Sequence, residues 1–521
     1  MGMVAPSRRI GSAFFVCFGQ YGDVSRFAKE QGVSRQLVYR DAQQVSTALD
    51  GTSTQSVIDS LNAEVVDLRR QCADLQGRLD LAVVVDKEKQ TEFASVGQAC
   101  GVTLLQCRTL LGVLIRQPLS VPSLGRASFA MGQKAGAILQ VLDSFTRPKV
   151  LDAAADEIYV KEPALMIVEQ ESLCWVTGHL SSEVSGPAWS TEFACLPNLE
   201  QVARDGGKGL AKGVALVNAQ RSENNQEPIV DQGDHFHALR PGGVGLRRAE
   251  QRAQKALDEA EETQKALDEC ARQGRSQTGP TSRARHAWLR AEQAMDAWSA
   301  IDRAWQETKQ ALPLITPAGD LNTRAKAEAK LAATLAQLPD NDFAKAKRQL
   351  QRPEMLNYLD VVEKKLAQLP LADEVKQAAI QQEALRRRPE LLKGETPQAA
   401  TMRGILLMCT VILSKSGEAG TQATASVREI FRRAYRASSL VECINSVLRM
   451  HQAQHRKMSQ ELLDLKRLYW NSHEFRTGRR RGTTPYQRLG VPWPAGKSWW
   501  EVLKMTPEQL RDKLSITKMA A

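Results

Sequence analysis

Three acidic residues stand in local sequences that could supply ligands for divalent cations. Asp156 lies at the start of the strand-like stretch ADEIYV, and Asp205 ends the apolar stretch EQVARD just before Gly206 and Gly207. Glu442 lies in SSLVECINSVLR, which has the apolar spacing of a helix. Carboxylates on two strand ends and one helix can hold two cations about 3.5–4 Å apart, a pair that activates a water or 3′-hydroxyl in phosphodiester chemistry. Hard oxygen ligands suit Mg²⁺ or Mn²⁺.

The elements that must position these carboxylates follow one another in the sequence. ADEIYV (155–160), PALMIVE (163–169) and LCWVTGHL (173–180) are rich in β-branched and aromatic residues and predict three consecutive strands. EQVAR (200–204) predicts a fourth, and the glycines after Asp205 keep the backbone slim before a helix. The helix of Glu442 has an apolar stripe that can pack on a sheet and fix the carboxylate. The stripe consists of Leu440, Val441, Ile444, Val447 and Leu448.

Other residues compete for these places. Glu157 competes for the first position, and Glu429, Glu461 and Glu474 compete for the third. A single Asp at a strand start or before glycines is more often a turn or capping residue than a metal ligand. The prediction therefore rests on the three carboxylates together.

Two histidines, His235 and His237, stand two residues apart in DHFHALR. On one face of a strand such a pair can bind a metal, but no nearby Cys or further His completes a zinc set. A structural role is favoured over a hydrogen bond near a scissile phosphate.

The acidic pattern resembles the catalytic domain of the DDE transposases of bacterial insertion sequences, members of the RNase H-like superfamily that includes retroviral integrases. In that family the first Asp lies on the first strand, the second follows the fourth strand, and the Glu lies on a later helix; Asp156, Asp205 and Glu442 match these places. The form Ser-x-Val-Glu-x-x-Asn-x-x-Leu-Arg (439–449) resembles the Glu helix, and EFRTGRRRGTTPYQRLG (474–490) resembles the tail after it. The resemblance covers roughly residues 150–235 and 425–505, and the gap from Asp205 to Glu442 is far longer than in compact members.

The resemblance implies an α/β RNase H-like catalytic core with a large all-α insertion, preceded by helical helix-turn-helix units, in a chain that is mostly helical. It implies metal-dependent strand cleavage at element ends and strand transfer into target DNA. Asp156 and Asp205 would bridge or bind two Mg²⁺ or Mn²⁺ ions, and Glu442 would hold the second. Two alternatives stay open: an RNase H-like nuclease without strand transfer, and a catalytically inert DNA-binding protein with an architectural or regulatory role.

Five segments are expected along the chain. Residues 1–55 form a helix-turn-helix unit, and 56–148 form a helical linker that includes a candidate second DNA-binding unit. Residues 149–239 and 429–521 supply the two parts of the core, the latter with the Glu helix and a basic tail. Residues 240–428 form an α-helical insertion with a repeated QKALDE and three tryptophans on its second helix. Holding DNA ends, binding target DNA, contacting a second subunit and serving as a solvated spacer all stay open for it.

The amino-terminal stretch DVSRFAKEQGVSRQLVYRDAQQV (23–45) has helix-turn-helix spacing. Gly32 makes the turn, Val33 fills the core, and Ser34 caps the second helix. That helix would enter the major groove, where Arg and Gln read base edges. Its expected DNA contacts are Arg35, Gln36, Tyr39 and Arg40. An ordinary helical hairpin is the alternative.

Two further helical patterns follow. FASVGQACGVTLLQCRTLLGVLI (93–115) repeats the Gly-Val turn, which fits a second DNA-binding unit or plain packing. Before it, a short heptad-like stripe fits a two-stranded coil or a helical linker containing Gly77. The stripe consists of Leu61, Val65, Leu68, Cys72, Leu75 and Leu79.

The positive charge is concentrated at the carboxyl end. Residues 421–521 contain 19 Lys and Arg against 8 Asp and Glu, whereas the first 420 residues contain 51 of each kind. Such a segment can bind the phosphates of double-stranded DNA, here element ends and target. Interleaved aromatic residues argue for a folded region over a solvated tail. The expected phosphate contacts beside the acidic site are Arg476, Arg479, Arg480 and Arg481.

The composition indicates a globular protein, with 42% hydrophobic and 25% charged residues among 521. The apolar runs GILLMCTVIL and FFVCFG are too short for a bilayer span or a signal peptide, so we expect no membrane partner and a cytoplasmic, nucleoid-associated location in a bacterium. The nine cysteines lack a C-x-x-C pair and are expected to be reduced and mostly packed. We also expect a homo-oligomer, at least a dimer on DNA.

Overall fold

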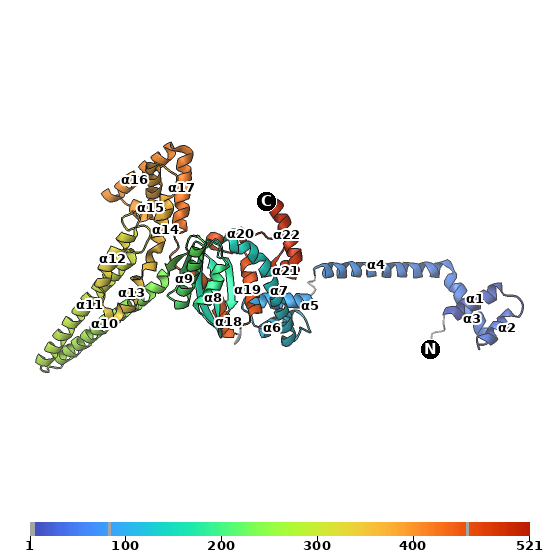
Figure 1. The fold of residues 1–521 in the computed structure, drawn as a ribbon. Helices are drawn as coiled ribbons and strands as arrows, with labels where there is room; N and C mark the ends of the chain where they lie inside the picture. Colours follow the sequence, from blue (N-terminus) through green and yellow to red (C-terminus); the bar gives the residue numbers. More distant parts are fainter. Residues whose placement is uncertain (1–5, 82–84, 455–457, 521) are drawn as a thin grey trace. The chain divides into compact units, whose positions relative to one another are not determined.

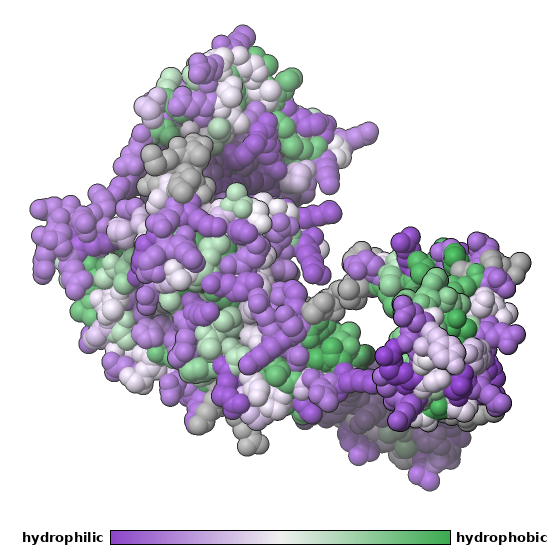
Figure 2. Space-filling view, turned by 90° about the vertical axis from the view of Figure 1, so that its right-hand side faces the viewer, coloured by the Kyte–Doolittle hydropathy of each residue, from purple (hydrophilic) through white to green (hydrophobic). Residues whose placement is uncertain are grey.

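The chain divides into two compact units, residues 1–85 and residues 86–521, called here the amino-terminal unit and the main unit. The structure is a computed structural model that describes residues 6–81, 85–454 and 458–520. It is mostly helical and contains one small mixed sheet, in the main unit. The face shown in Figure 2 is largely hydrophilic, with hydrophobic residues gathered in smaller patches.

The amino-terminal unit consists of four helices: α1 (Pro6–Phe18), α2 (Asp23–Glu30), α3 (Arg35–Leu49) and α4 (Gly51–Leu81), labelled in Figure 1. Phe27, Ala28 and Val38 form the small core of α1–α3. Gly32 has a φ of 65°, a left-handed conformation that favours glycine, and the Ser34 side chain accepts a hydrogen bond from the Leu37 N–H at the start of α3. The predicted turn and cap are thus present, together with a third helix, α1.

The sheet of the main unit has the strand order β3-β2-β1-β4-β5. Strands β1, β4 and β5 are parallel, whereas β2 is antiparallel to both of its neighbours. The strands are β1 (Asp152–Val160), β2 (Glu162–Glu169), β3 (Trp175–Leu180), β4 (Gln201–Arg204) and β5 (Val230–Gly233). The second and third predicted strands are confirmed. Asp156 lies in the middle of β1, not at its start, because the run Ala153–Ala155, weak in strand propensity, is held as strand between β2 and β4.

Helices cover both faces of this sheet. On one face, α8 (Gly186–Ala194) and α9 (Lys208–Glu223) pack through Trp189 and Val214 against Ala153 and Ala155. On the other face, α18 (Ser439–Gln454) packs its Val441, Ile444 and Leu448 against Ala154, Ile158 and Met166 of the sheet. This confirms the predicted packing of the apolar stripe and fixes which way α18 faces.

A second helical layer adjoins the sheet. Helix α7 (Val121–Thr146) packs against α19 (Gln460–Ser472) around Leu142, Leu465 and Leu468. The remaining helices here are α5 (Lys87–Ala99), α6 (Leu104–Leu114), α20 (Pro485–Leu489), α21 (Trp499–Lys504) and α22 (Pro507–Ala520). Much of the basic carboxyl-terminal segment is therefore folded around α7.

The segment between β5 and α18 forms a helical body with its own hydrophobic core. Two long helices, α10 (His235–Arg272) and α11 (Thr278–Gln310), run side by side as a hairpin (Figure 1). Further helices are α12 (Arg324–Ala336), α13 (Asp340–Leu350), α14 (Asn357–Ala367), α15 (Asp373–Arg386), α16 (Pro397–Lys415) and α17 (Gly417–Arg432). A buried core that includes Trp305, Phe343 and Tyr358 is the feature of a folded body rather than of a solvated spacer. Helix α10 begins before the expected boundary at residue 240 and continues through Pro241.

The structure bears on two expectations drawn from composition, one about apolar segments and one about the cysteines. Among the described residues, α16 is long and apolar enough to cross a membrane by length and composition, with a mean hydropathy of 1.2. This helix contains the run GILLMCTVIL together with Arg403 and Lys415, and its Cys409 and Leu413 belong to the core of the helical body. The cysteines are less packed than expected, since Cys17, Cys72, Cys100 and Cys443 are exposed.

Candidate metal centre

The strand register gathers acidic residues just past the carboxyl ends of β4 and β5, beside the middle of β1. Ala155 of β1 pairs with Arg204 of β4, which pairs with Gly233 of β5. The next residues along these three strands are Asp156, Asp205 and Asp234. Because neighbouring parallel strands lie about 4.8 Å apart, adjacent places in the register put their side chains in one neighbourhood.

The tightest part of this group is formed by Asp156, Glu157 and Asp205, whose ligand oxygens lie within 4.8 Å of one another. Burial, followed by the nearby charges of Asp205 and Glu442, raises the pKa of Asp156 to about 7. Burial and the charges of Asp205 and Asp156 raise the pKa of Glu157 to about 7. Each carboxylate therefore disfavours the ionised form of its neighbours, a cost that a cation between them would relieve.

Helix α18 brings Glu442 to the same place. One turn after Glu442, the buried Asn445 donates a hydrogen bond from Nδ2 to Asp156 Oδ2 at 2.8 Å. The Glu442 carboxylate lies 3.8 Å from His237 Nε2 and forms an ion pair with Arg449 at 2.9 Å. Its charge raises the pKa of Asp156, although it stands outside the tightest group. The structure thus brings all three predicted carboxylates together and adds Glu157.

Asp234 joins the start of α10 to the start of α18. Its Oδ1 caps α10 by accepting from the Phe236 N–H at 2.6 Å, and its Oδ2 accepts from the Ser438 N–H at 3.0 Å and from the Ser438 hydroxyl. The same oxygen accepts from His237 Nδ1 at 2.8 Å. Burial opposes ionisation, but these hydrogen bonds lower the pKa of Asp234 overall. Sequence reasoning missed this residue, although an Asp immediately before a helical stretch, here His235 onwards, is an N-cap signal.

The two histidines do not share a strand face, because Asp234 starts a helix at this point. His235 is buried, and its Nε2 lies 2.7 Å from the Met355 carbonyl oxygen. His237 faces the carboxylates, and its hydrogen bond to Asp234 raises its pKa against the opposing effect of burial. The two side chains therefore have separate surroundings and do not form a paired site on one strand face.

The donor set fits a hard divalent cation. The buried Oε2 atom of Glu157 has no hydrogen-bond partner among the described residues. A Cβ on Gly207 would lie 2.9 Å from Asp205 Oδ1 and 3.6 Å from Glu157 Oε1, so the glycine leaves room for both carboxylates. Asp156, Glu157 and Asp205 together offer several carboxylate oxygens, which are the ligands that Mg²⁺ and Mn²⁺ prefer.

The other acidic competitors lie outside this group in the described part of the chain. Glu429 forms an ion pair with Arg432, and Glu461 lies on α19 against Gly132 of α7. Glu474 is exposed in the loop after α19. Of the four competitors, only Glu157 stays a candidate ligand.

A cleft of about 630 Å³ opens beside Asp205, between α10 and α13. It is lined by Arg240 and Arg248 of α10, Lys345 of α13 and Arg352 just after α13. Arg240, Arg248 and Lys345 are exposed, and none of the three forms an ion pair within the described residues. Three positively charged side chains without an ion-pair partner among the described residues therefore line a cleft that adjoins the acidic group.

Seven of the eight predicted DNA-binding residues are exposed, and one is half-buried. Arg35, Gln36, Tyr39 and Arg40 are all exposed on α3. Arg476, Arg479 and Arg481 are exposed as well, but Arg480 is half-buried and donates to the carbonyl oxygens of Gln170 and Glu171 at 3.1 and 3.0 Å.

The position of Arg480 corrects a prediction. The Gln170 N–H donates to the carbonyl of Asp152, the first residue of β1, so Arg480 lies at the amino end of β1. The acidic group lies past the carboxyl ends of β4 and β5. The expectation that Arg480 grips phosphate beside the acidic site is therefore wrong: it ties the tail to the β2–β3 turn instead.

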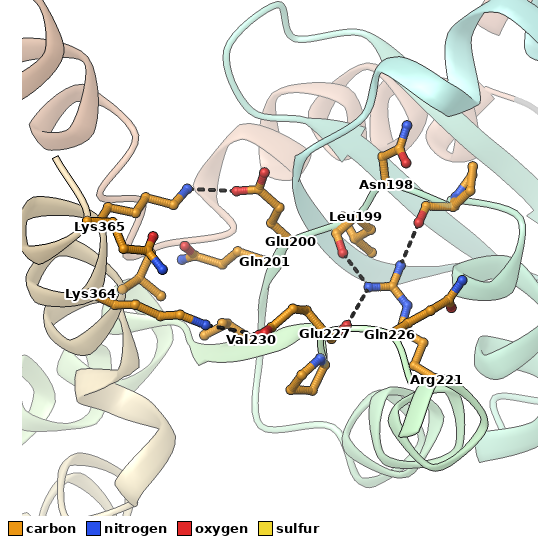
Figure 3. Close-up of a pocket in the computed structure, with 14 residues that line it drawn as sticks. Asn198, Leu199, Glu200, Gln201, Arg221, Gln226, Glu227, Val230, Lys364 and Lys365 are labelled. Carbon is orange, nitrogen blue, oxygen red and sulfur yellow. Dashed lines mark hydrogen bonds and ion pairs between the residues drawn. The ribbon is translucent and has the colours of Figure 1, made fainter. Parts of the chain in front are cut away.

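A separate cavity of about 550 Å³ lies at the amino ends of β4 and β5, away from the acidic group. Figure 3 shows Lys364 and Lys365 of α14 reaching Glu227 and Glu200, at 3.0 and 2.7 Å. Arg221 donates to main-chain carbonyls, including that of Leu199 at 2.7 Å. Since these cations are all engaged within the protein, the cavity offers no free charge for a ligand.

Comparisons with protein-family models, curated proteins and solved structures find no match for this chain.

Proposed function

We propose that this chain is a metal-dependent enzyme that cuts and joins DNA, a DDE-type transposase with an RNase H-like core. The observation that carries the proposal is the meeting of Asp156 and Asp205 at adjacent register positions with a helix that holds Glu442 against β1. The order of elements agrees with the one expected for this superfamily: an Asp on the first strand, an Asp after the fourth and a Glu on a later helix.

The chain's own groups fit this chemistry. Asp156, Asp205 and Glu442 would hold the cations, with Glu157 as a further ligand beside them. Two divalent cations, when bound, would activate the attacking water or 3′-hydroxyl and stabilise the leaving oxygen. Asn445 fixes the orientation of Asp156, and Asp234 fixes that of His237. The positively charged side chains of the α10–α13 cleft would hold the sugar–phosphate backbone close to the carboxylates.

The helix-turn-helix unit would supply sequence recognition. Helix α3 packs against the core of its unit with Val38 and exposes its other face to solvent. The exposed side chains include Arg35, Gln36, Tyr39 and Arg40. A deletion of residues 1–50 should abolish preference for one duplex sequence and spare general affinity, because base contacts and phosphate contacts are separable. Selection from random duplexes should yield a motif with the full chain and none with the deletion variant.

The test of catalysis is cleavage of duplexes that carry the DNA flanking the coding region, in Mg²⁺ and in Mn²⁺. Asp156→Asn, Asp205→Asn and Glu442→Gln should each abolish cleavage and leave DNA binding nearly intact. Glu474→Gln is the matched control, because Glu474 is exposed and lies outside the acidic group. It should cleave like the parent.

Precleaved ends distinguish the candidate activities. Joining of such ends to a second duplex indicates a transposase, and hydrolysis without joining indicates the nuclease alternative. DNA binding with no cleavage of any duplex, in either metal, would leave the inert DNA-binding protein and contradict the proposal. Full activity of Glu442→Gln together with loss in Glu157→Gln would transfer the third ligand to Glu157.

A further inference from the structure

Helix α4 carries a row of apolar side chains that the described residues of the amino-terminal unit leave uncovered. Leu61, Leu68 and Leu75 are 55%, 51% and 59% exposed, and Ile58 and Val65 are 45% and 44% exposed. Cys72, which belongs to the same row, is exposed too. Leucine is among the residues that proteins most often bury, so a continuous exposed row of this length indicates an interaction surface.

The spacing of the row is that of a coiled coil. Ile58, Leu61, Val65, Leu68, Cys72 and Leu75 follow one another at alternating steps of three and four residues, and Leu79 continues the series. This repeat averages 3.5 residues, so it stays on one seam only when the helix supercoils around a partner helix. In heptad terms Ile58, Val65, Cys72 and Leu79 take position a, and the three other leucines take position d.

The residue types select the kind of partner. β-Branched residues at a, here Ile58 and Val65, combined with Leu at d favour a parallel two-stranded arrangement. Gly77 falls at position f, on the side away from the seam, and nothing lies within 4 Å of where its Cβ would be. The glycine therefore costs some helix propensity, about 1 kcal/mol, without opening a hole in the seam.

Charge complementarity points to a second copy of the same chain. Glu64 takes position g, and Arg69, five residues later, takes position e of the next heptad. In a parallel, in-register pair, position g of one helix faces the following position e of the other. Glu64 of each copy would therefore lie beside Arg69 of the other copy, which gives two ion pairs per dimer. Both side chains are exposed, and neither forms an ion pair within the described residues.

We propose that α4 forms a parallel, in-register, two-stranded coiled coil with α4 of a second copy of this chain. The pairing needs no DNA and does not depend on the proposed function. Its seam spans roughly three heptads, long enough for a short zipper. It would hold two copies of the α1–α3 unit at one end of the coil and would align the two Cys72 side chains with each other.

The first test is the mass of the full-length chain without DNA, measured by light scattering and sedimentation at micromolar concentration. The parent should be a dimer, and Leu68→Asp should be a monomer because it puts charge into the seam. Ala63→Asp is the matched control, since Ala63 is exposed at position f, and it should stay dimeric. Circular dichroism establishes that each variant is folded. A monomeric parent, or a folded Leu68→Asp variant that stays dimeric, would overturn the proposal.

The second test fixes direction and register. In a chain with Cys17, Cys100 and Cys443 changed to Ser, mild oxidation with diamide should link two copies through Cys72. Moving the thiol to the outer side, as Cys72→Ser with Gly77→Cys, should prevent the link. Glu64→Arg should weaken the dimer at least several-fold, and Arg69→Glu in the same chain should restore it. A dimer that cannot be linked through Cys72, or that is insensitive to the charge exchange, contradicts the parallel arrangement.

Discussion

At the scale of single residues, the acidic group combines burial with mutual repulsion. Asp156 and Glu157 both have a pKa raised to about 7, first by burial and then by neighbouring carboxylates. Hydrogen bonds from Asn445 and from the Glu157 N–H orient Asp156 but do not neutralise it. Holding these carboxylates close together lowers the stability of the metal-free protein and favours the binding of a cation. Such an arrangement is typical of functional sites.

This repulsion predicts a pH-dependent stability that a divalent cation reverses. Between pH about 4 and 7, a carboxyl with a raised pKa binds its proton in the folded state and has lost it in the unfolded state, so the free energy of unfolding falls as pH rises. Without divalent ions, the Tm should therefore decrease from pH 5 to pH 8. Mn²⁺ should raise the Tm at pH 8 and change it little at pH 5, because protons compete for the ligands.

The control for this measurement is Asp156→Asn, which removes one of the two carboxyl groups whose pKa is raised to about 7. Differential scanning fluorimetry of the two proteins should show a smaller fall in Tm with pH and a smaller Mn²⁺ effect in the variant. An equal Mn²⁺ effect in both proteins would place the cation elsewhere.

At the scale of elements, α10 begins beside the acidic group and is also the first helix of the helical body. Its first turn is fixed by Asp234, and two turns later Gly242 lies against the ring of Trp305. A Cβ on Gly242 would lie 2.1 Å from the ring, whereas Gly243, one residue further, has nothing within 4 Å of its Cβ position. The close approach of α10 and α11 therefore depends on one glycine of the pair.

The two adjacent glycines give a matched prediction. Gly242→Ala should lower the free energy of unfolding by about 1–3 kcal/mol, because the added methyl group overpacks a contact that is already filled. Gly243→Ala should be neutral or stabilise by up to about 1 kcal/mol, because alanine is the better helix former. Urea unfolding of both variants checks this. A larger loss in Gly243→Ala than in Gly242→Ala would mean that α10 and α11 approach differently.

The elements also show which parts the sequence could predict. Local patterns sufficed for the α3 cap at Ser34, for β2 and β3, and for the packing face of α18, since each depends on neighbours in the sequence. The start of β1 was missed because its alanines are strand only through pairing with β2 and β4. The place of Arg480 was missed because its partners lie about 300 residues away.

At the scale of the whole chain, long-range pairing decides the candidate site. The sequence suggested Asp156, Asp205 and Glu442, but only the register of β1 and β4 brings the two aspartates together. The α10–α13 cleft unites residues about a hundred positions apart, and no local pattern predicts it. Glu157 competes with Asp156 for the first position in the sequence, and in the structure it is a neighbour of both aspartates.

The cleft predicts how the main unit binds DNA. Combined replacement of Arg240, Arg248 and Lys345 by Ala should weaken binding to all duplexes alike and flatten the slope of log affinity against log salt by about 0.9 for each lost phosphate contact. The control replaces Lys255, Lys265 and Arg275, which are exposed and do not line the cleft, with the same change in charge. It should keep most of the slope. Equal flattening in both variants would indicate attraction by net charge alone.

The proposed metal site can be observed in a crystal structure of the chain grown with Mn²⁺, with anomalous diffraction recorded at the manganese edge. Peaks should lie between the carboxylates of Asp156 and Asp205, within coordination distance of both, and one of them should also contact Glu442. The same measurement on Asp205→Asn should lose at least one peak. A crystal saturated with Mn²⁺ but with no anomalous peak at these carboxylates would show that they do not form a metal site.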